Sequence, residues 1–358
     1  MEFDVTTHAT TWDHVADLAR RTEAAGFSGM LFTEVQQVPW MNIAAASLAA
    51  PSLHFSTGIA IAFARSPMIA AQIAWELAQN TKGKFRLGLG SQVKAHITKR
   101  YASTFDKPAP QMKDYVQAVK ACLRAFRREG ALMHDGPYYK LSLLTEQWTP
   151  SRHEYEDIKV DISAVGPFMV RVAGEVADGV HVHPMHSMHY IRNRLLPGLA
   201  EGAARAGRDP ATIDKIIPVI VAAGDTSEAR ATPIKEAKTA IAFYGATPNY
   251  AFQFDDLGHH GLRDQLRDCL KTGDSVRSQA LITDEILNQF AIVARWDDVA
   301  DRMIERYKGI ASRLVIYPPG REVDSKTFER WGEVARAVRQ AGESSTRHDG
   351  HKLAVASR

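Results

Sequence analysis

The sequence has few of the features that mark secreted, membrane-bound or nucleic-acid-binding proteins. Only two cysteines occur in 358 residues, Cys122 and Cys269, and their wide separation argues against a disulfide scaffold or a cysteine-based zinc site. Lys and Arg number 44 against 41 Asp and Glu, so the net charge of +3 gives no sign of a nucleic-acid or anionic-membrane partner. No apolar run approaches the ~20 residues of a membrane span, and the acidic start does not resemble a signal peptide. We therefore expect a cytoplasmic protein.

What the sequence does contain is a regular alternation of short β-branched runs and amphipathic helical segments. This alternation is typical of a parallel α/β fold, and 45% hydrophobic with 24% charged residues is an ordinary composition for a globular enzyme. Because eight strands each precede a helix, the pattern predicts a closed (β/α)8 TIM barrel rather than an open doubly wound sheet. We expect the strands at residues 3–7, 29–33, 53–62, 85–89, 160–164, 179–183, 216–222 and 313–317.

The remaining segments are predicted to decorate this barrel. Helices interrupted by turn residues fill about 230–290, which predicts a helical insertion between strands 7 and 8. Residues 91–108 are expected to form a long polar loop, and Asp135-Gly136 predicts a small hairpin. We expect residues 1–341 to form one domain, with a last helix over 325–340. Residues 342–358 lack apolar periodicity and are expected to be a disordered tail.

A barrel of this kind carries its chemistry at the carboxyl ends of its strands. After the fourth strand, Gly88-Leu-Gly90 begins like a dinucleotide-binding fingerprint but lacks the third glycine and follows the wrong strand. These glycines fit either a close approach of the backbone to a flat ligand or a tight turn. After the fifth strand, Gly166-Pro167 fits either free amides that face a phosphate or an ordinary helix start.

Ionisable side chains at other strand ends leave several interpretations open. Glu34 follows the second strand and is a candidate for acid/base chemistry, for hydrogen bonding, or for a salt bridge to Arg65 or Lys94. His181 and His183 share one face of a strand, so they can chelate a metal, lie in the core, or contact a substrate or cofactor. A metal site also needs carboxylates at other strand ends, and the eighth strand ends without one. We therefore assign no metal ligand.

Four segments, in this order along the chain, resemble the luciferase-like monooxygenase (LLM) family, in particular its branch that uses the deazaflavin coenzyme F420. The resemblance runs from Met1 to about Pro319 and implies an oxidoreductase that transfers a hydride between the deazaflavin ring and a small organic substrate. It also implies a homodimer. Trp40, Phe63 and Tyr244, with Met185, are expected to ring the mouth and favour an apolar substrate. The four segments are 21–29 (RTEAAGFSG), 62–68 (AFARSPM), 84–96 (KFRLGLGSQVKAH) and 173–184 (AGEVADGVHVHP).

The resemblance also implies roles for individual residues around the cofactor. In the family, a non-proline cis peptide in the third strand backs the ring, and here the matching pair is Gly58 and Ile59. Glu34 matches an acid near the ring. The loop that lines the cofactor is matched by Gly90, Ser91, Gln92 and His96. The backbone around its phosphate is matched by Ala164, Val165 and Gly166, and a neighbour of that phosphate by His183.

One departure from the family concerns proton transfer. The dehydrogenases of this family carry a histidine directly after the acid of the second strand, whereas this chain has Val35. Their proton-transfer residue therefore has no counterpart, and His8, Glu34 and His96 remain catalytic candidates by location. The alternatives are an FMN-dependent monooxygenase on the same scaffold, a metal-dependent barrel hydrolase using His181 and His183, and a cofactor carrier without catalysis.

Overall fold

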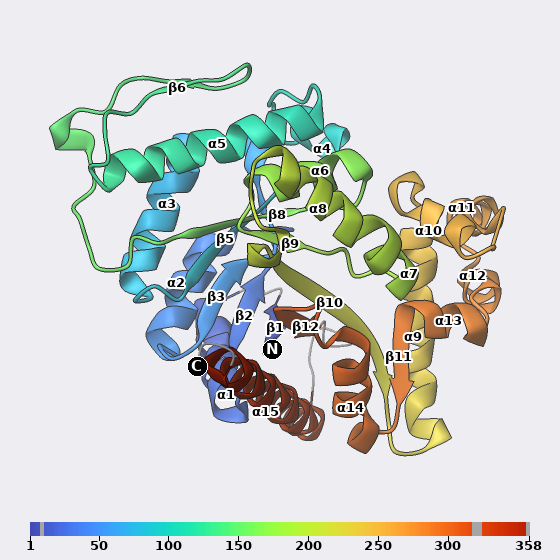
Figure 1. The fold of residues 1–358 in the computed structure, drawn as a ribbon. Coiled ribbons are helices and arrows are strands. Elements are labelled where there is room, and N and C mark those ends of the chain that lie inside the picture. The colour runs from blue at the N-terminus through green and yellow to red at the C-terminus, as the bar shows by residue number, and fades with distance from the viewer. Residues whose placement is uncertain (8–10, 317–323, 356–358) are drawn as a thin grey trace.

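A closed barrel of parallel strands forms the centre of the molecule (Figure 1), and the computed structural model describes residues 1–7, 11–316 and 324–355. Each barrel strand pairs with its two neighbours in chain order, and β10 and β12 close the ring by pairing with β9 and β1. This confirms the predicted (β/α)8 barrel. Its strands are β1 (Glu2–Thr7), β2 (Gly29–Phe32), β3 (His54–Thr57), β5 (Phe85–Gly90), β8 (Lys159–Ser163), β9 (Gly179–His181), β10 (Asp214–Ala223) and β12 (Arg313–Ile316).

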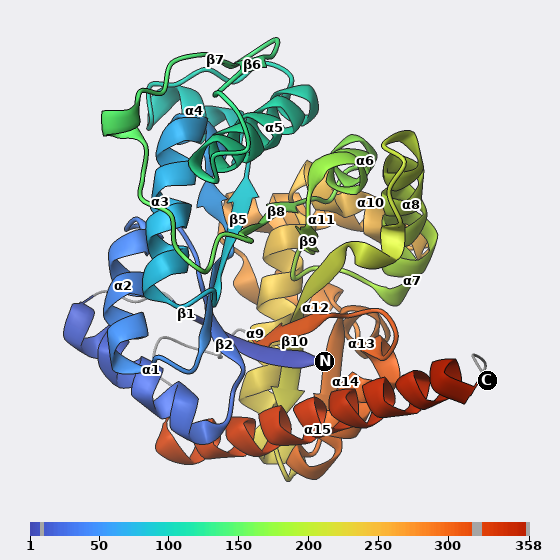
Figure 2. The ribbon, with the colours of Figure 1, turned by 60° about the vertical axis from the view of Figure 1, so that its left-hand side comes forward.

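Helices surround this barrel, and their starts follow from the local sequence. Ser66 accepts a hydrogen bond from the amide of Ile69 at the start of α3, and Pro67 occupies the first helical position, where no donor is lost. Figure 2 shows α15 packed along α1 and α14. The helices that follow the barrel strands are α1 (Trp12–Ala25), α2 (Pro39–Ala49), α3 (Pro67–Asn80), α5 (Pro108–Phe126), α6 (Pro167–Val176), α7 (Met188–Tyr190), α8 (Leu196–Arg205), α14 (Trp296–Tyr307) and α15 (Ser325–Val355), with a π-helical turn at Ile191–Leu195.

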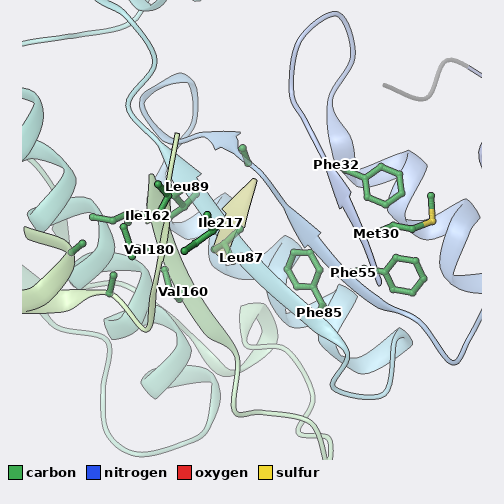
Figure 3. Packing of buried hydrophobic residues seen from close by; sticks show 14 of the residues in the cluster. Met30, Phe32, Phe55, Phe85, Leu87, Leu89, Val160, Ile162, Val180 and Ile217 are labelled. Carbon is green, nitrogen blue, oxygen red and sulfur yellow. The ribbon is translucent and has the colours of Figure 1, made fainter. Parts of the chain in front are cut away.

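The main hydrophobic core lies between the strands and the helices. Figure 3 shows its side chains from neighbouring strands, among them Met30, Phe55 and Leu87. Because side chains alternate across a strand, Leu31 faces the opposite way from Met30 and forms a small interior cluster with Ile216 and Val315. The same alternation brings charged residues into the barrel, where they form ion pairs between neighbouring or nearby strands. These pairs are Asp4–Arg313, Arg86–Asp161 and Arg86–Asp214.

The segment between β10 and β12 forms the predicted insertion and has its own hydrophobic core. Ile241 and Phe254 are fully buried in this second cluster, which also takes in Met185 from the barrel mouth. Parallel to β10 runs an additional strand, β11 (Ala291–Ala294), that the sequence did not predict. The insertion helices are α9 (Ser227–Gly245), α10 (Pro248–Asp256), α11 (Leu262–Thr272), α12 (Ser275–Leu281) and α13 (Asp284–Phe290).

Three further predictions differ from the structure. The predicted third strand is divided into β3 and β4 (Ala60–Ile61), and the predicted polar loop contains a short helix, α4 (Lys94–Lys99). The last helix, α15, continues to Val355 through residues expected to be disordered, because extending an existing helix needs no new nucleation and no apolar stripe. The predicted hairpin is present as β6 (His134–Asp135) and β7 (Lys140–Leu141). Within the described residues, no helix is long and apolar enough to cross a membrane.

Candidate functional site

The mouth of the barrel is lined on one side by the interruption of the third strand. The peptide bond between Gly58 and Ile59 is cis, as the resemblance implies. A Cβ atom on Gly58 would lie 2.1 Å from Cδ2 of Leu31, and one on Gly90 would lie 2.5 Å from Cδ1 of Ile59. Neighbouring side chains thus pack directly onto the backbone at both positions, and a larger residue there would displace Leu31 or Ile59. The segment 58–61 forms a backbone wall next to the end of β5, with Gly58 and Ile59 half-buried and Ala60 and Ile61 fully buried.

Glu34 is fully engaged with this wall. Its Oε2 accepts hydrogen bonds from the amide of Ile61 at 2.7 Å and from Arg65 at 2.9 Å, and its Oε1 accepts a second bond from the same guanidinium. Arg65 also donates to the carbonyl of Ile61 and lies over the ring of Trp40. The Glu34 side chain is only 2% exposed. The structure thus favours the salt bridge to Arg65 among the interpretations of Glu34, and this bridge ties the end of β2 to β4.

The loop after β5 lies beside the same part of the mouth. Gln92 adopts a positive φ of 57° and its own Oε1 accepts a hydrogen bond from the amide of Val93, while Ser91 is half-buried. His96 lies on the exposed surface of α4. Arg100 donates to the carbonyl of Val35 at 2.7 Å, which joins the end of α4 to the loop that follows Glu34. His8 lies outside the described residues.

The start of α6 offers backbone amides at the mouth. Gly166 caps this helix without any side-chain hydrogen bond, and a Cβ atom added to it would meet nothing within 4 Å. The two residues before Gly166 are held by hydrogen bonds. The amide of Ala164 donates to the carbonyl of His181, and the carbonyl of Val165 accepts from the hydroxyl of Tyr190. An open, uncapped helix start of this kind has the donors and the space that a phosphate needs.

His183 is enclosed by aromatic rings of the insertion. Its ring stacks on Tyr250 with a centroid separation of 3.9 Å and meets Tyr244 edge-on at 4.6 Å. Its Nδ1 accepts a hydrogen bond from the amide of Met185 at 3.1 Å. Burial, together with the nearby His186, lowers the pKa of His183 to about 3. His183 is therefore a neutral ring whose proton is on Nε2 near neutral pH.

His181 has different surroundings from His183. It lies inside the barrel, with Nε2 3.7 Å from Oδ2 of Asp161, which is too long for a hydrogen bond. Burial alone would raise the pKa of Asp161, but Arg86, through its charge and hydrogen bonds, and His181 together outweigh it and hold that pKa well below its usual range. In the part of the chain that the structure describes, no group of three or more histidine, cysteine or carboxylate side chains is placed to bind a metal.

The four apolar residues expected to ring the mouth are not exposed there. Trp40, Phe63 and Met185 are buried in the hydrophobic cores, the first two in the main core and Met185 in that of the insertion, and Tyr244 is half-buried. Valines that the sequence analysis did not select are exposed instead. Directly after the ends of β2 and β5, Val35 is 53% exposed and Val93 45% exposed.

Sequence reasoning also missed the residues that support the site from a distance. Tyr190, Tyr250 and Gln253 contact the strand ends from later helices, and Tyr307 in α14 bonds to His186. None of these residues belongs to a motif or lies at a strand end. Only the three-dimensional packing of α7, α10 and α14 around the barrel mouth identifies them.

Comparison with known proteins agrees with this geometry. The family model described as luciferase-like monooxygenase matches residues 1–313. The chain belongs to the luciferase-like monooxygenase family. This places it among the oxidoreductases. The uncharacterized protein Rv1360 of Mycobacterium tuberculosis is 35% identical over 300 residues, covering 84% of this chain and 88% of the relative. The 5,10-methylenetetrahydromethanopterin reductase of Methanopyrus kandleri is 25% identical over 310 residues, covering 80% and 83%.

Solved structures of luciferase-like proteins share this barrel. The coenzyme F420-dependent tetrahydromethanopterin reductase from Methanopyrus kandleri superposes with a TM-score of 0.76 at 20% identity, covering 92% of this chain and 97% of the other. The oxygenating constituent of 3,6-diketocamphane monooxygenase from Pseudomonas putida, solved with FMN, gives a TM-score of 0.62 at 17% identity, covering 94% and 98%. At these identities the structures establish the common fold, and they include one protein described with each cofactor.

Proposed function

We propose that this luciferase-like protein is an F420-dependent oxidoreductase that transfers a hydride between the deazaflavin ring and a small organic substrate. One observation carries the proposal of a ring cofactor with a phosphate: the mouth combines a backbone wall, half-buried at Gly58 and Ile59, with an open, uncapped helix start at Gly166. A ring with a phosphate-bearing side chain needs both features. The relationship to a methylenetetrahydromethanopterin reductase along most of both chains supports the same choice. We also propose that the protein acts as a homodimer in the cytoplasm.

The residues of the chain fit this cofactor as follows. Gly58 and Ile59 would back the ring, and the loop residues Gly90, Ser91 and Gln92 would line its edge. The backbone from Ala164 to Gly166 and the first amides of α6 would hold the phosphate, with His183 as a further donor. Bound there, F420 supplies a ring carbon that exchanges a hydride with the substrate, because this carbon replaces the N5 atom of flavins.

The protein residues have two tasks beside binding. Glu34 fixes the wall through Ile61, so we assign it a positioning role, because Arg65 and Ile61 already occupy both of its oxygens. The exposed valines after β2 and β5 would cover the ring face against water and favour apolar parts of a substrate. For proton transfer, His96 and His8 stay the candidates that the sequence provides.

Cofactor titration tests the proposal directly. We expect the purified protein to bind F420 at least tenfold more tightly than FMN when binding is followed by fluorescence quenching. A preference for FMN would instead identify a flavin-dependent monooxygenase. With F420 bound, reduction or oxidation of a panel of aldehydes, ketones and enones then separates an enzyme from a cofactor carrier.

A matched pair of variants tests the phosphate position. Gly166 has extended backbone angles that suit an N-cap side chain, so Gly166→Asn and Gly166→Asp should both fold and stabilise α6. Only the aspartate adds a negative charge beside the proposed phosphate. We expect Gly166→Asp to bind F420 at least tenfold more weakly than Gly166→Asn. Equal affinities of the two variants would show that the anion binds elsewhere.

A further inference from the structure

The insertion holds the loop after β9 with a single buried amide side chain. Gln253 in α10 is fully buried; its Nε2 donates to the carbonyl of Met185 at 2.8 Å and its Oε1 accepts from the amide of Ser187 at 3.1 Å. These two bonds fix the backbone on both sides of His186. The amide of Met185 is in turn the group that donates to Nδ1 of His183.

A second set of contacts holds the same loop from its other side. Nδ1 of His186 contacts the carbonyl of His183 at 2.9 Å, and its Nε2 contacts the hydroxyl of the buried Tyr307 at 2.9 Å. The ring of His183 is itself held by stacking on Tyr250 and by the edge contact with Tyr244. The backbone and the ring of His183 are thus both fixed, by α9 and α10 of the insertion and by α14 of the barrel.

This arrangement selects one protonation state of His183. A backbone N–H can only donate, so Nδ1, which receives the bond from Met185, carries no proton in the neutral ring and the proton is on Nε2. The titratable groups that face the ring in the described residues are the phenols of Tyr244 and Tyr250 and the imidazole of His186. None of these is an anion near neutral pH, so nothing among them stabilises an imidazolium. No described residue accepts a hydrogen bond from Nε2.

We propose that Gln253 and Tyr250 are positioning residues that lock His183 as an uncharged Nε2–H donor to an oxygen acceptor of the bound cofactor. The insertion would then influence ligand binding through His183. The identity of the acceptor rests on the proposed function. The state of the His183 ring does not, and it can be measured in the cofactor-free protein.

Nitrogen NMR of protein labelled with 15N-histidine tests the lock. In the wild type we expect one tautomer of His183, protonated at Nε2, from pH 8 down to pH 5. In Gln253→Met, which keeps the side-chain length but loses both bonds, we expect a mixture of tautomers and protonation within this pH range. Gln289→Met is the control, because Gln289 lies in the same insertion and contacts His259 instead. A wild-type ring that titrates near pH 6.5, or an unchanged ring in Gln253→Met, overturns the proposal.

Cofactor affinity tests the consequence of the lock, using whichever of F420 and FMN the wild type binds. His183→Gln places an amide donor near the position of Nε2 and should weaken binding less than threefold, whereas His183→Phe keeps the stacking without the donor and should weaken it at least tenfold. Gln253→Met should weaken binding several-fold in the wild type and leave it unchanged in His183→Phe. Equal effects of Gln253→Met in both backgrounds contradict the proposal. If neither cofactor binds, the proposed function fails, while the NMR result still decides the state of His183.

Discussion

Replacing Arg65 by methionine should destabilise the protein far more than its position at the edge of the mouth suggests. The substitution leaves the carboxylate of Glu34, 2% exposed, with a single hydrogen bond from the amide of Ile61. Removing one partner of a buried ion pair costs about 3–5 kcal/mol. The entropy of unfolding at about 2.1 cal/mol/K per residue amounts to roughly 0.75 kcal/mol/K for this chain, so the melting temperature should fall by about 4–7 °C.

Two further variants give this prediction its controls. Glu34→Gln removes the charge but can still accept from Ile61, so the double variant Glu34→Gln/Arg65→Met should regain about 1–3 kcal/mol relative to Arg65→Met alone. Arg20→Met breaks an ion pair with Asp17 in which both side chains are about 60% exposed, and it should cost less than about 1 kcal/mol. Calorimetry and equilibrium denaturation measure all four proteins. If Arg65→Met lowers the free energy of unfolding no more than Arg20→Met does, the carboxylate of Glu34 does not depend on Arg65 as a buried partner, and the reasoning is refuted.

Other regions give further predictions. Asp114→Ala should expose the β6–β7 hairpin to limited proteolysis, because its carboxylate accepts hydrogen bonds from two hairpin amides and contacts His134, whereas the exposed Asp135→Ala should not. Gly88→Ala should lower the yield of folded protein or cost more than about 3 kcal/mol, because a Cβ atom there would lie 2.0 Å from a backbone carbonyl oxygen. Burial lowers the pKa of His186 to about 4 from an ordinary 6.5, so its contribution to stability should be full above pH 6.5 and be lost as the pH falls towards 4. His186→Gln should flatten the dependence of unfolding free energy on pH in that window by about 1 kcal/mol per pH unit, and an unchanged slope would contradict this.

The barrel was predictable because each of its strands and helices is indicated by residues close together in the sequence. Each strand of about five residues ends at a turn or a helix start, and the count of eight follows from this alternation alone. The same argument predicts where chemistry lies, since all carboxyl strand ends meet at one rim. The strand ends that carry the proposed site, from Glu34 to Gly166, were therefore selected from the pattern without any tertiary information.

The partners of these residues were not predictable in the same way. Glu34 and Arg65 are 31 residues apart, and the choice between Arg65 and Lys94 as the partner depends on how β4 lies against β2. Gln253 and Met185 are 68 residues apart, one in α10 of the insertion and the other in the loop after β9. The spacing of residues along the sequence does not predict contacts between positions so far apart. The helix within 91–108 was missed for another reason, because its exposed polar residues form no apolar stripe.

The barrel and the insertion contribute different groups to the proposed site. From the barrel come backbone atoms, at Gly58, Gly90 and Gly166, where glycine allows either close packing or open space. The insertion instead contributes side chains that act on His183 through stacking and through the 185–187 backbone. Backbone groups at strand ends cannot change without changing the barrel, whereas residues such as Tyr250 can change within a separate hydrophobic core. Substitutions in the insertion should therefore alter ligand affinity with little loss of barrel stability, and those at the three glycines should alter both where packing is tight.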